Sequence, residues 1–302
     1  MRRFLAAIVI LAVIGASLFW LVTKPSRVGA LPAYSPNPEN GKLMFYAGGC
    51  AACHATPDQD DATKLGGGAE LKSPFGTFYA PNISSDRNDG IGAWTETDFV
   101  NAVWKGTSPD GRHYFPVFPY SSYQRMRITD IRDLFAFLKT LPAVQGRARG
   151  HDLRFPYNVR RLVGGWKFLF VDSLTYTYDP AQSPQWNRGA YLVAGPGHCV
   201  ECHSPRNALG GIVASQRFAG GPTADGEGWV PNITPAGIGS YSVGDIERIL
   251  ATGVNPDGDS VGGDMAKVVR NMSQLSKEDR TAIATFVKSL PPVQGPKPPE
   301  KK

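Results

Sequence analysis

The sequence predicts a mainly α-helical protein made of two tandem copies of one small, loop-rich domain, preceded by a single N-terminal transmembrane helix. Three observations lead to this prediction. A five-residue motif occurs twice, 149 residues apart, beginning at Cys50 and at Cys199. The segment 126–146 matches 275–295 at the same offset without a gap. The N-terminus contains a long uncharged stretch. A chain of 302 residues also suits two domains, because domains commonly have about 100–200 residues.

The uncharged N-terminal stretch runs from Phe4 to Thr23, and its 20 residues are about the length needed to cross a bilayer. We expect residues 1–30 to be an uncleaved membrane anchor. A cleaved signal peptide is the alternative, although the apolar core of a signal peptide usually has only about 7–15 residues. In both cases Arg2 and Arg3 make the N-terminal flank the more positive one, so it should stay in the cytoplasm. The rest of the chain is then expected on the side of the membrane opposite the cytoplasm.

Each repeat predicts a helix before its motif and an amphipathic helix at its end. Short helical segments are expected at 41–46 and at 189–193. The last helix of the first repeat is indicated by apolar residues at i, i+3, i+4 and i+7, namely Ile131, Leu134, Phe135 and Leu138. In the second repeat, Ser276 and Asp279 predict a capping box at the start of the last helix.

Two glycines suggest how these helices pack. Gly41 and Gly189 should let the first helix of each repeat cross closely against the last one, near Phe137 and Phe286. The region between the repeats contains several aromatic residues, which favours an ordered connector over a flexible linker. The predicted divisions are an anchor at 1–30, a first domain at 31–146, the connector at 147–185, a second domain at 186–295 and a disordered tail at 296–302.

The repeated motif is Cys-x-x-Cys-His, and its copies contain all four cysteines of the chain. Two thiols at i and i+3 lie on one side of a helical turn, where they can attach to the two vinyl groups of one porphyrin. The histidine that follows can then bind the iron. The sequence therefore predicts two covalently bound haem c groups. Their attachment residues are Cys50, Cys53, Cys199 and Cys202, and their proximal iron ligands are His54 and His203.

A zinc site or a pair of redox dithiols is the alternative reading of the cysteines, since Cys-x-x-Cys serves in both. The halves of zinc ribbons are about 15–20 residues apart, whereas Cys53 and Cys199 are 146 apart. Each cysteine pair also carries its own histidine. Haem attachment accounts for the histidines, and the alternatives do not.

The sixth iron ligand should separate the two haems, because a His/Met pair suits electron transfer and an open position permits ligand chemistry. In the second repeat Met265 follows two glycines, which leave room for close approach to the haem edge. We expect Met265 to ligate the second haem. Met272 is the nearby competitor, and it is more simply read as a core residue.

The chain, with these motifs, resembles the membrane-bound multihaem cytochrome c subunits of bacterial periplasmic alcohol, gluconate, sorbitol and related aldehyde dehydrogenases. The resemblance covers about residues 38–295. In that family the domains have the class I cytochrome c fold, and electrons pass from a dehydrogenase subunit to ubiquinone or to a terminal oxidase. The residues that carry the resemblance are Pro74–Thr77, Asn82–Ile83, Gly90–Gly92, Asp110–His113, Pro116–Tyr120, Trp186–Tyr191, Gly197–Cys199, His203–Asn207 and Gly263–Ala266.

Two departures limit what the resemblance implies. Family members typically carry three haem motifs, and this chain has two. The family's Pro-Ala-Met-Pro-Tyr segment would also place a methionine ligand at position 118, where this chain has Phe118. We expect Met126 to take that role through a rearranged loop, although it aligns with the apolar Leu275 in the repeat. His113 and a five-coordinate haem beside Phe118 stay open as alternatives.

These observations favour a membrane-anchored dihaem cytochrome c in the inner membrane. Its donor would be a periplasmic dehydrogenase subunit, and its acceptor quinone, an oxidase or another cytochrome of the respiratory chain. The alternative is a dihaem enzyme, a peroxidase or sulfur-compound oxidoreductase, with the first haem catalytic. The sequence offers no dinucleotide fingerprint, nucleophile elbow or phosphate loop. Nucleic acid is not expected as a partner, because the basic residues are scattered rather than gathered in a stripe.

Overall fold

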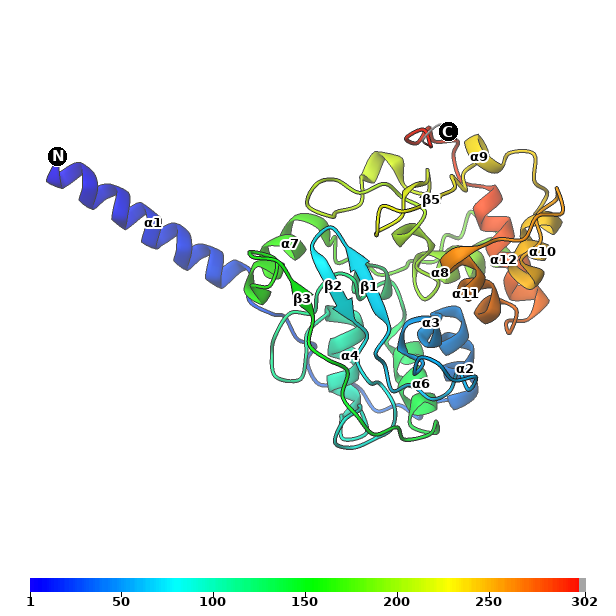
Figure 1. Cartoon of the computed structure of the whole chain (residues 1–302), viewed down its shortest axis with the longest axis horizontal. Coiled ribbons are helices and arrows are strands. Elements are labelled where there is room, and N and C mark those ends of the chain that lie inside the picture. Colours follow the sequence, from blue (N-terminus) through cyan, green and yellow to red (C-terminus); the bar gives the residue numbers. More distant parts are fainter. Residues whose placement is uncertain (299–302) are drawn as a thin grey trace.

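The computed structural model describes residues 1–298, and helices dominate it (Figure 1). Of the predicted tail, residues 299–302 lie outside the described range. The helices are α1 (Arg2–Val22), α2 (Pro38–Ala47), α3 (Cys50–His54), α4 (Glu96–Lys105), α5 (Tyr120–Tyr123), α6 (Ile128–Leu138), α7 (Val163–Phe170), α8 (Pro184–Ala194), α9 (Pro235–Ile238), α10 (Val243–Thr252), α11 (Gly263–Met272) and α12 (Lys277–Lys288). Three short 3₁₀ helices are η1 (Arg160–Leu162), η2 (Cys199–Glu201) and η3 (Ala214–Gln216).

Helix α1 projects alone from the body of the protein (Figure 1). Its side chains are exposed along its length, and within residues 1–298 it is the one helix long and apolar enough to cross a membrane. Its C-terminus is fixed, because Thr23 is buried and its carbonyl lies 2.8 Å from Nε2 of His113. The predicted N-terminal helix is therefore present.

The two predicted helix crossings are both present. Helix α2 packs against α6, and α8 packs against α12. A Cβ atom on Gly41 would lie 2.0 Å from the carbonyl oxygen of Asp133, and one on Gly189 would lie 1.9 Å from that of Ala282. Both distances are far inside van der Waals contact, so only glycine allows the helix backbones to approach this closely. The same crossing recurs in both halves of the chain, while the division into two separate domains stays a prediction.

Substituting Gly189 by alanine is expected to destabilise the holoprotein by about 1–3 kcal/mol, because the added methyl group must push α8 away from α12. The measurement is the denaturant midpoint with its m-value. Gly244→Ala is the matched control. It lies in α10, where the nearest atom to an added Cβ is 3.7 Å away, so helix propensity should leave the control unchanged or raise its stability by up to about 1 kcal/mol. Equal midpoints for G189A and wild type would contradict the close crossing.

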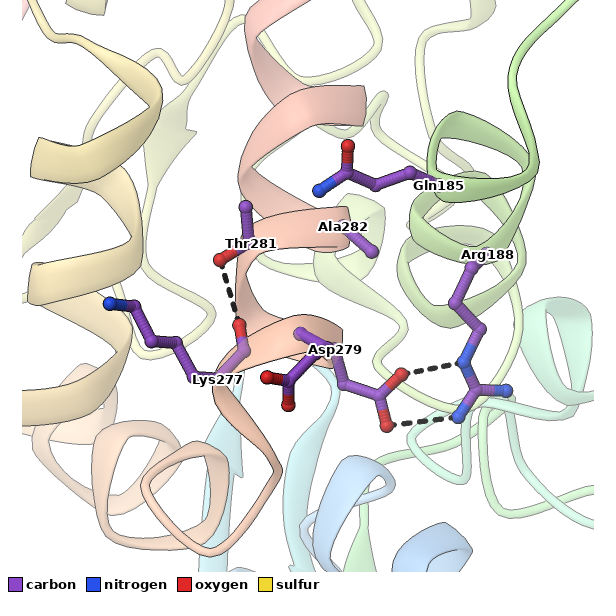
Figure 2. A pocket seen from close by; sticks show the side chains of 7 residues that line it. Gln185, Arg188, Lys277, Asp279, Thr281 and Ala282 are labelled. Atoms are coloured by element: carbon purple, nitrogen blue, oxygen red, sulfur yellow. Dashed lines mark hydrogen bonds and ion pairs between the residues drawn. The ribbon is translucent and has the colours of Figure 1, made fainter.

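The start of α12 differs in part from the predicted capping box. The Oγ of Ser276 accepts a hydrogen bond from the backbone N–H of Asp279 at 3.1 Å, as expected. The Asp279 carboxylate, however, does not return to Ser276. It pairs with the guanidinium of Arg188 on α8 at 2.7 and 3.0 Å, beside the glycine crossing (Figure 2). The sequence pattern indicates only the local partner, Ser276, whereas in the structure the Asp279 carboxylate bonds to Arg188 of α8 instead.

A three-stranded antiparallel sheet covers one side of the first half, and the sequence analysis missed it. Strands β1 (Glu70–Ser73) and β2 (Gly76–Tyr79) form a hairpin, and β3 (Asp152–Leu153) from the connector pairs with β2 (Figure 1). A second small hairpin joins β4 (Gly221–Pro222) and β5 (Trp229–Val230). The strands have two to four residues, which is too short for a clear alternating pattern.

The connector packs against both halves of the chain, as expected of an ordered segment. Toward the first half, the ammonium of Lys167 donates to the carbonyls of Lys105 and Gly106, each at 2.7 Å. Toward the second half, the indole N–H of Trp166 donates to the carbonyl of Leu209 at 3.0 Å. The ring of Phe170 lies against Gly211. These contacts tie the two halves to one intervening helix.

Lys167 also makes the stability depend on pH. Burial, with a smaller contribution from Lys105, lowers the pKa of Lys167 from 10.5 to about 7. Between these two values the unfolded chain holds one more proton than the folded chain, so stability should rise with pH across that window. Comparing urea midpoints at about pH 7.5 and about pH 9.5 tests this, because Lys167→Met should flatten the rise. The same pH slope in both proteins would contradict the assignment.

The buried core is continuous across the two halves. Met126 is 2% exposed and belongs to the same apolar cluster as Tyr191, Leu192 and Val193. A Cβ on Gly195 would lie 3.4 Å from the Cγ of Met126. The hydroxyl of Tyr191 donates to the carboxylate of Asp130 on α6. The predicted boundaries between domains therefore fall within one packed body, and they stay predictions.

Candidate haem-binding site

The two Cys-x-x-Cys-His motifs adopt related turns. The first forms α3, and the second begins with η2 and continues through Cys202 to His203. Each turn is preceded by a residue with left-handed backbone: Gly49 has a φ of +56° and His198 a φ of +39°. The four cysteines form no disulfide bond with one another.

The cysteines do not have the properties of a redox dithiol. Burial raises the pKa of Cys50 and of Cys199 to about 12. Reactive dithiols instead have a lowered pKa, because the thiolate is the nucleophile. In the part of the chain that the structure describes, no group of three or more His, Cys, Asp or Glu side chains could hold a metal ion. The raised pKa values of Cys50 and Cys199 argue against the dithiol alternative.

The two motif histidines are held in the same way. Nδ1 of His54 lies 2.8 Å from the carbonyl oxygen of Pro81, and Nδ1 of His203 lies 2.8 Å from that of Pro231. A carbonyl only accepts, so Nδ1 carries the proton in both rings and Nε2 keeps its lone pair. Burial lowers the pKa of both imidazoles despite the opposing effect of these hydrogen bonds, which keeps the rings neutral. A neutral ring oriented through Nδ1 is the form that binds iron through Nε2.

The loops that supply these carbonyls are themselves fixed by a repeated contact. The side-chain amide of Asn82 donates to the carbonyl of Val144 at 2.7 Å, and that of Asn232 donates to Val293 at 2.8 Å. Each asparagine follows the proline that orients the motif histidine. The sequence repeats Pro-Asn-Ile at 81–83 and at 231–233, and this repeat was given no role in the predictions from sequence. Its recurrence at nearly the motif offset was the available signal.

The two motifs meet at the boundary between the halves. The carbonyl of Gly48, two residues before Cys50, accepts from Nε2 of His198 at 3.3 Å and from the hydroxyl of Tyr123 at 3.4 Å. His198 directly precedes Cys199, and its ring packs edge-on against Tyr123. Backbone next to one motif is thus hydrogen-bonded to a side chain next to the other. The sequence analysis did not anticipate this contact.

Glu201, inside the second motif, adds a polar link to the first half. Its carboxylate accepts from the hydroxyls of Ser121 and Ser122 at 2.8 and 2.7 Å, and pairs with Arg206 at 2.7 Å. Burial alone would raise the pKa of Glu201. The charge of Arg206 and the three hydrogen bonds outweigh it and hold the pKa below its ordinary value. The Glu201 carboxylate therefore stays charged where the two halves of the chain meet.

Met265 lies in the first turn of α11 and is half-buried. Helix α11 packs against α10 in its own half and against α2 and α3 in the other. Asp264, the preceding residue, acts electrostatically on both Cys53 and Cys202. The first turn of α11 is thus close to both motifs, and the assignment of Met265 to the second haem stays a prediction. Met272 is buried in the core, as its simpler reading implied.

The residues considered for the other side of the first haem lie in different places. Met126 packs in the core against Gly195, so the structure gives it a packing role, and its role as a ligand stays a prediction. His113 is bonded to Thr23 at the base of α1. Phe118 packs edge-on against the rings of Tyr120 and Tyr123. The hydroxyl of Tyr123 donates to the carbonyl of Gly48, so Phe118 is linked through the ring of Tyr123 to the backbone that precedes the first motif.

Comparisons with known proteins identify the family of this chain. Residues 38–142 match the cytochrome c family model. A "Diheme cytochrome c-type" protein from Cereibacter sphaeroides is 46% identical over 97% of this chain and 100% of its own length. The chain belongs to the c-type cytochrome family. Covalent haem c therefore follows for this cytochrome, and the dihaem relative suggests that the number is two.

Two further relatives are dehydrogenase subunits. The fructose dehydrogenase cytochrome subunit of Gluconobacter japonicus is 34% identical over 89% of this cytochrome. The alcohol dehydrogenase (quinone) cytochrome c subunit of Gluconobacter oxydans is 36% identical over 84% of it. This cytochrome spans only 55% of the length of each. The resemblance drawn from the sequence is confirmed, and electron transfer is the activity that it implies.

Proposed function

We propose that this chain is a membrane-anchored dihaem cytochrome c that accepts electrons from a periplasmic dehydrogenase and passes them to quinone, an oxidase or another cytochrome of the respiratory chain. In this proposal Cys50, Cys53, Cys199 and Cys202 attach the haems, and His54 and His203 bind the irons. The haem irons supply the one-electron chemistry when bound. The protein supplies attachment, orientation and a fixed distance between the sites.

The observation that carries the proposal is the contact of Gly48 with His198 and Tyr123. It joins the two attachment motifs through backbone and side chains rather than through solvent. The two proximal histidines have the same Nδ1–carbonyl partner at the same distance, which suits two sites of one kind. Adjacent, similarly built sites are what a relay requires.

Helix α1 supports the proposed anchor and location. Its 21 residues give a helix of about 32 Å, which matches a hydrocarbon core of about 30 Å. The positive flank at Arg2 and Arg3 favours a cytoplasmic N-terminus and periplasmic haems. The names of the relatives favour a dehydrogenase as the electron donor.

Deleting the gene tests the proposal. Membranes that lack the chain should lose oxygen uptake driven by one class of dehydrogenase substrate, among alcohols, sugars and sugar acids. Uptake driven by NADH serves as the control and should persist. Wild type should restore the lost activity, and the Cys50→Ala, Cys53→Ala double variant should not. Unchanged respiration on every substrate would contradict a role in this chain of electron carriers.

A dihaem enzyme is the second possibility, and the ring of Phe118 is the observation that favours it, since an apolar ring near the first motif could leave an iron position open. Carbon monoxide binding to the reduced protein, together with rapid oxidation by peroxide, would support this enzyme. A first haem that is six-coordinate and insensitive to carbon monoxide in both oxidation states would rule it out.

A further inference from the structure

Helix α7 presents apolar side chains to solvent on one face. Leu162, which immediately precedes the helix, is 44% exposed, Phe168 is 69% exposed and Leu169 is 63% exposed. Val163 and Gly164 on the opposite side are buried. At about 100° per residue, Leu162 and Leu169 fall almost on one line along the helix, and Phe168 lies about 120° around the axis from Leu162, so the three side chains bound one face that is about a third of the helix surface. The exposed face is therefore the apolar one, which is the reverse of an ordinary surface helix.

The end of α1 lies on that same face. Gly165 lies within this face, and a Cβ on it would lie 3.1 Å from the ring of Phe19. A Cβ on the neighbouring Gly164 would lie 2.2 Å from the carbonyl oxygen of Thr23. The last turn of α1 is thus pressed onto α7, and the exposed side chains of α7 flank it. Figure 1 places α7 at the root of α1.

The charges around α7 suit a lipid surface. Between Arg154 and Val171 the sequence has no acidic residue and four basic ones. The guanidinium of Arg161 stacks over the ring of Trp20 at 4.3 Å and donates to its backbone carbonyl. Tryptophan and arginine are typical of the membrane–water interface. Lys167, the basic residue within α7, is bonded into the protein body, so the arginines that precede the helix are the basic residues beside its apolar face, an arrangement typical of interfacial helices. Phe155, seven residues before Leu162 in the sequence, is 81% exposed.

We propose that α7 lies in the headgroup layer of the bilayer that α1 spans, with Leu162, Phe168, Leu169 and Phe155 inserted among the lipids. The inference rests on the proposed anchoring by α1, and it commits the apolar surface to lipid. The apolar surface of α7 continues the surface of the membrane span, because α7 is packed against Phe19 and Thr23, where that span ends. A second contact of this kind would fix the tilt of the cytochrome body, where α1 alone would act as a tether.

The test uses the full-length holoprotein in nanodiscs of phosphatidylethanolamine and phosphatidylglycerol. Single cysteines at Phe168 and at Leu169 carry a nitroxide spin label, and collision with oxygen is compared with collision with a water-soluble nickel chelate. Gln185→Cys on α8 is the water-exposed control, and Leu11→Cys in α1 is the membrane-buried control. The visible spectrum of each variant checks that haem attachment is unchanged.

Labels at 168 and 169 are expected to favour oxygen over the nickel chelate several-fold more than the label at 185. If they match the label at 185 while the label at 11 is buried, α1 spans the bilayer and the α7 proposal is wrong. If the label at 11 is also open to the nickel chelate, the anchoring itself fails, and the α7 proposal fails with it.

Discussion

Replacing Cys199 and Cys202 together by alanine is expected to yield a cytochrome with one covalent haem instead of two. Each Cys-x-x-Cys pair attaches one porphyrin, and the motifs do not share a cysteine. The remaining haem should still be attached through Cys50 and Cys53. Electron transfer from dehydrogenase to acceptor should be lost, because one of the two sites of the relay is gone. Haem is counted on the denatured protein by its pyridine haemochrome spectrum.

The mirror variant, with Cys50 and Cys53 replaced, is the control. It should also carry one haem, and its spectrum and potential should be those of the second site alone. The two variants together then assign each spectrum to one motif, which also shows where Met265 and Met126 act. Two haems in either variant, or a fully loaded protein that survives both double substitutions, would contradict attachment through these cysteines.

Replacing Glu201 by alanine is expected to destabilise the holoprotein by about 1–3 kcal/mol. The side chain of Glu201 is only 10% exposed, and the substitution removes the carboxylate that pairs with Arg206, although the guanidinium keeps its bonds to the carbonyls of Glu201 and Gly210. The substitution also leaves the hydroxyls of Ser121 and Ser122 without their acceptor. Because this carboxylate joins the second motif to the first half, the loss should appear as weaker cooperativity between the halves during unfolding.

The denaturant midpoint and slope, followed at both haems, measure this effect. Arg112→Ala is the control. It breaks an ion pair with Asp110 in which the two side chains are 64% and 52% exposed, so the cost should be within about 1 kcal/mol. A Glu201→Ala midpoint as close to wild type as that of the control would mean that the boundary is not held together by this carboxylate.

Local pattern predicted the parts of the fold that depend on near neighbours in sequence. The amphipathic spacing of Ile131 to Leu138 predicted α6, and the uncharged run from Phe4 predicted α1. The glycines at 41 and 189 predicted both helix crossings, because no other residue fits where two helix backbones touch. Each of these patterns either spans neighbouring residues or recurs at a fixed offset, so it can be recognised in the sequence without knowledge of the fold.

The contacts that build the site were harder to predict because they are long-range. The carbonyls of Pro81 and Pro231 that orient the motif histidines lie 27 and 28 residues away from them. Glu201 finds its serine partners about 80 residues away, and β3 pairs with a strand more than 70 residues earlier. No local periodicity records such pairings. The repeated Pro-Asn-Ile was the one visible trace of them.

The mass of the intact, denatured full-length protein is the sharpest test for two covalent haems. Covalent haem c stays attached on denaturation, so we expect a mass equal to that of the polypeptide plus two haem groups. Digestion should then place one haem on the peptide with Cys50 and Cys53 and the other on the peptide with Cys199 and Cys202. A mass corresponding to one haem or none, in protein from cells competent for haem attachment, would contradict the account.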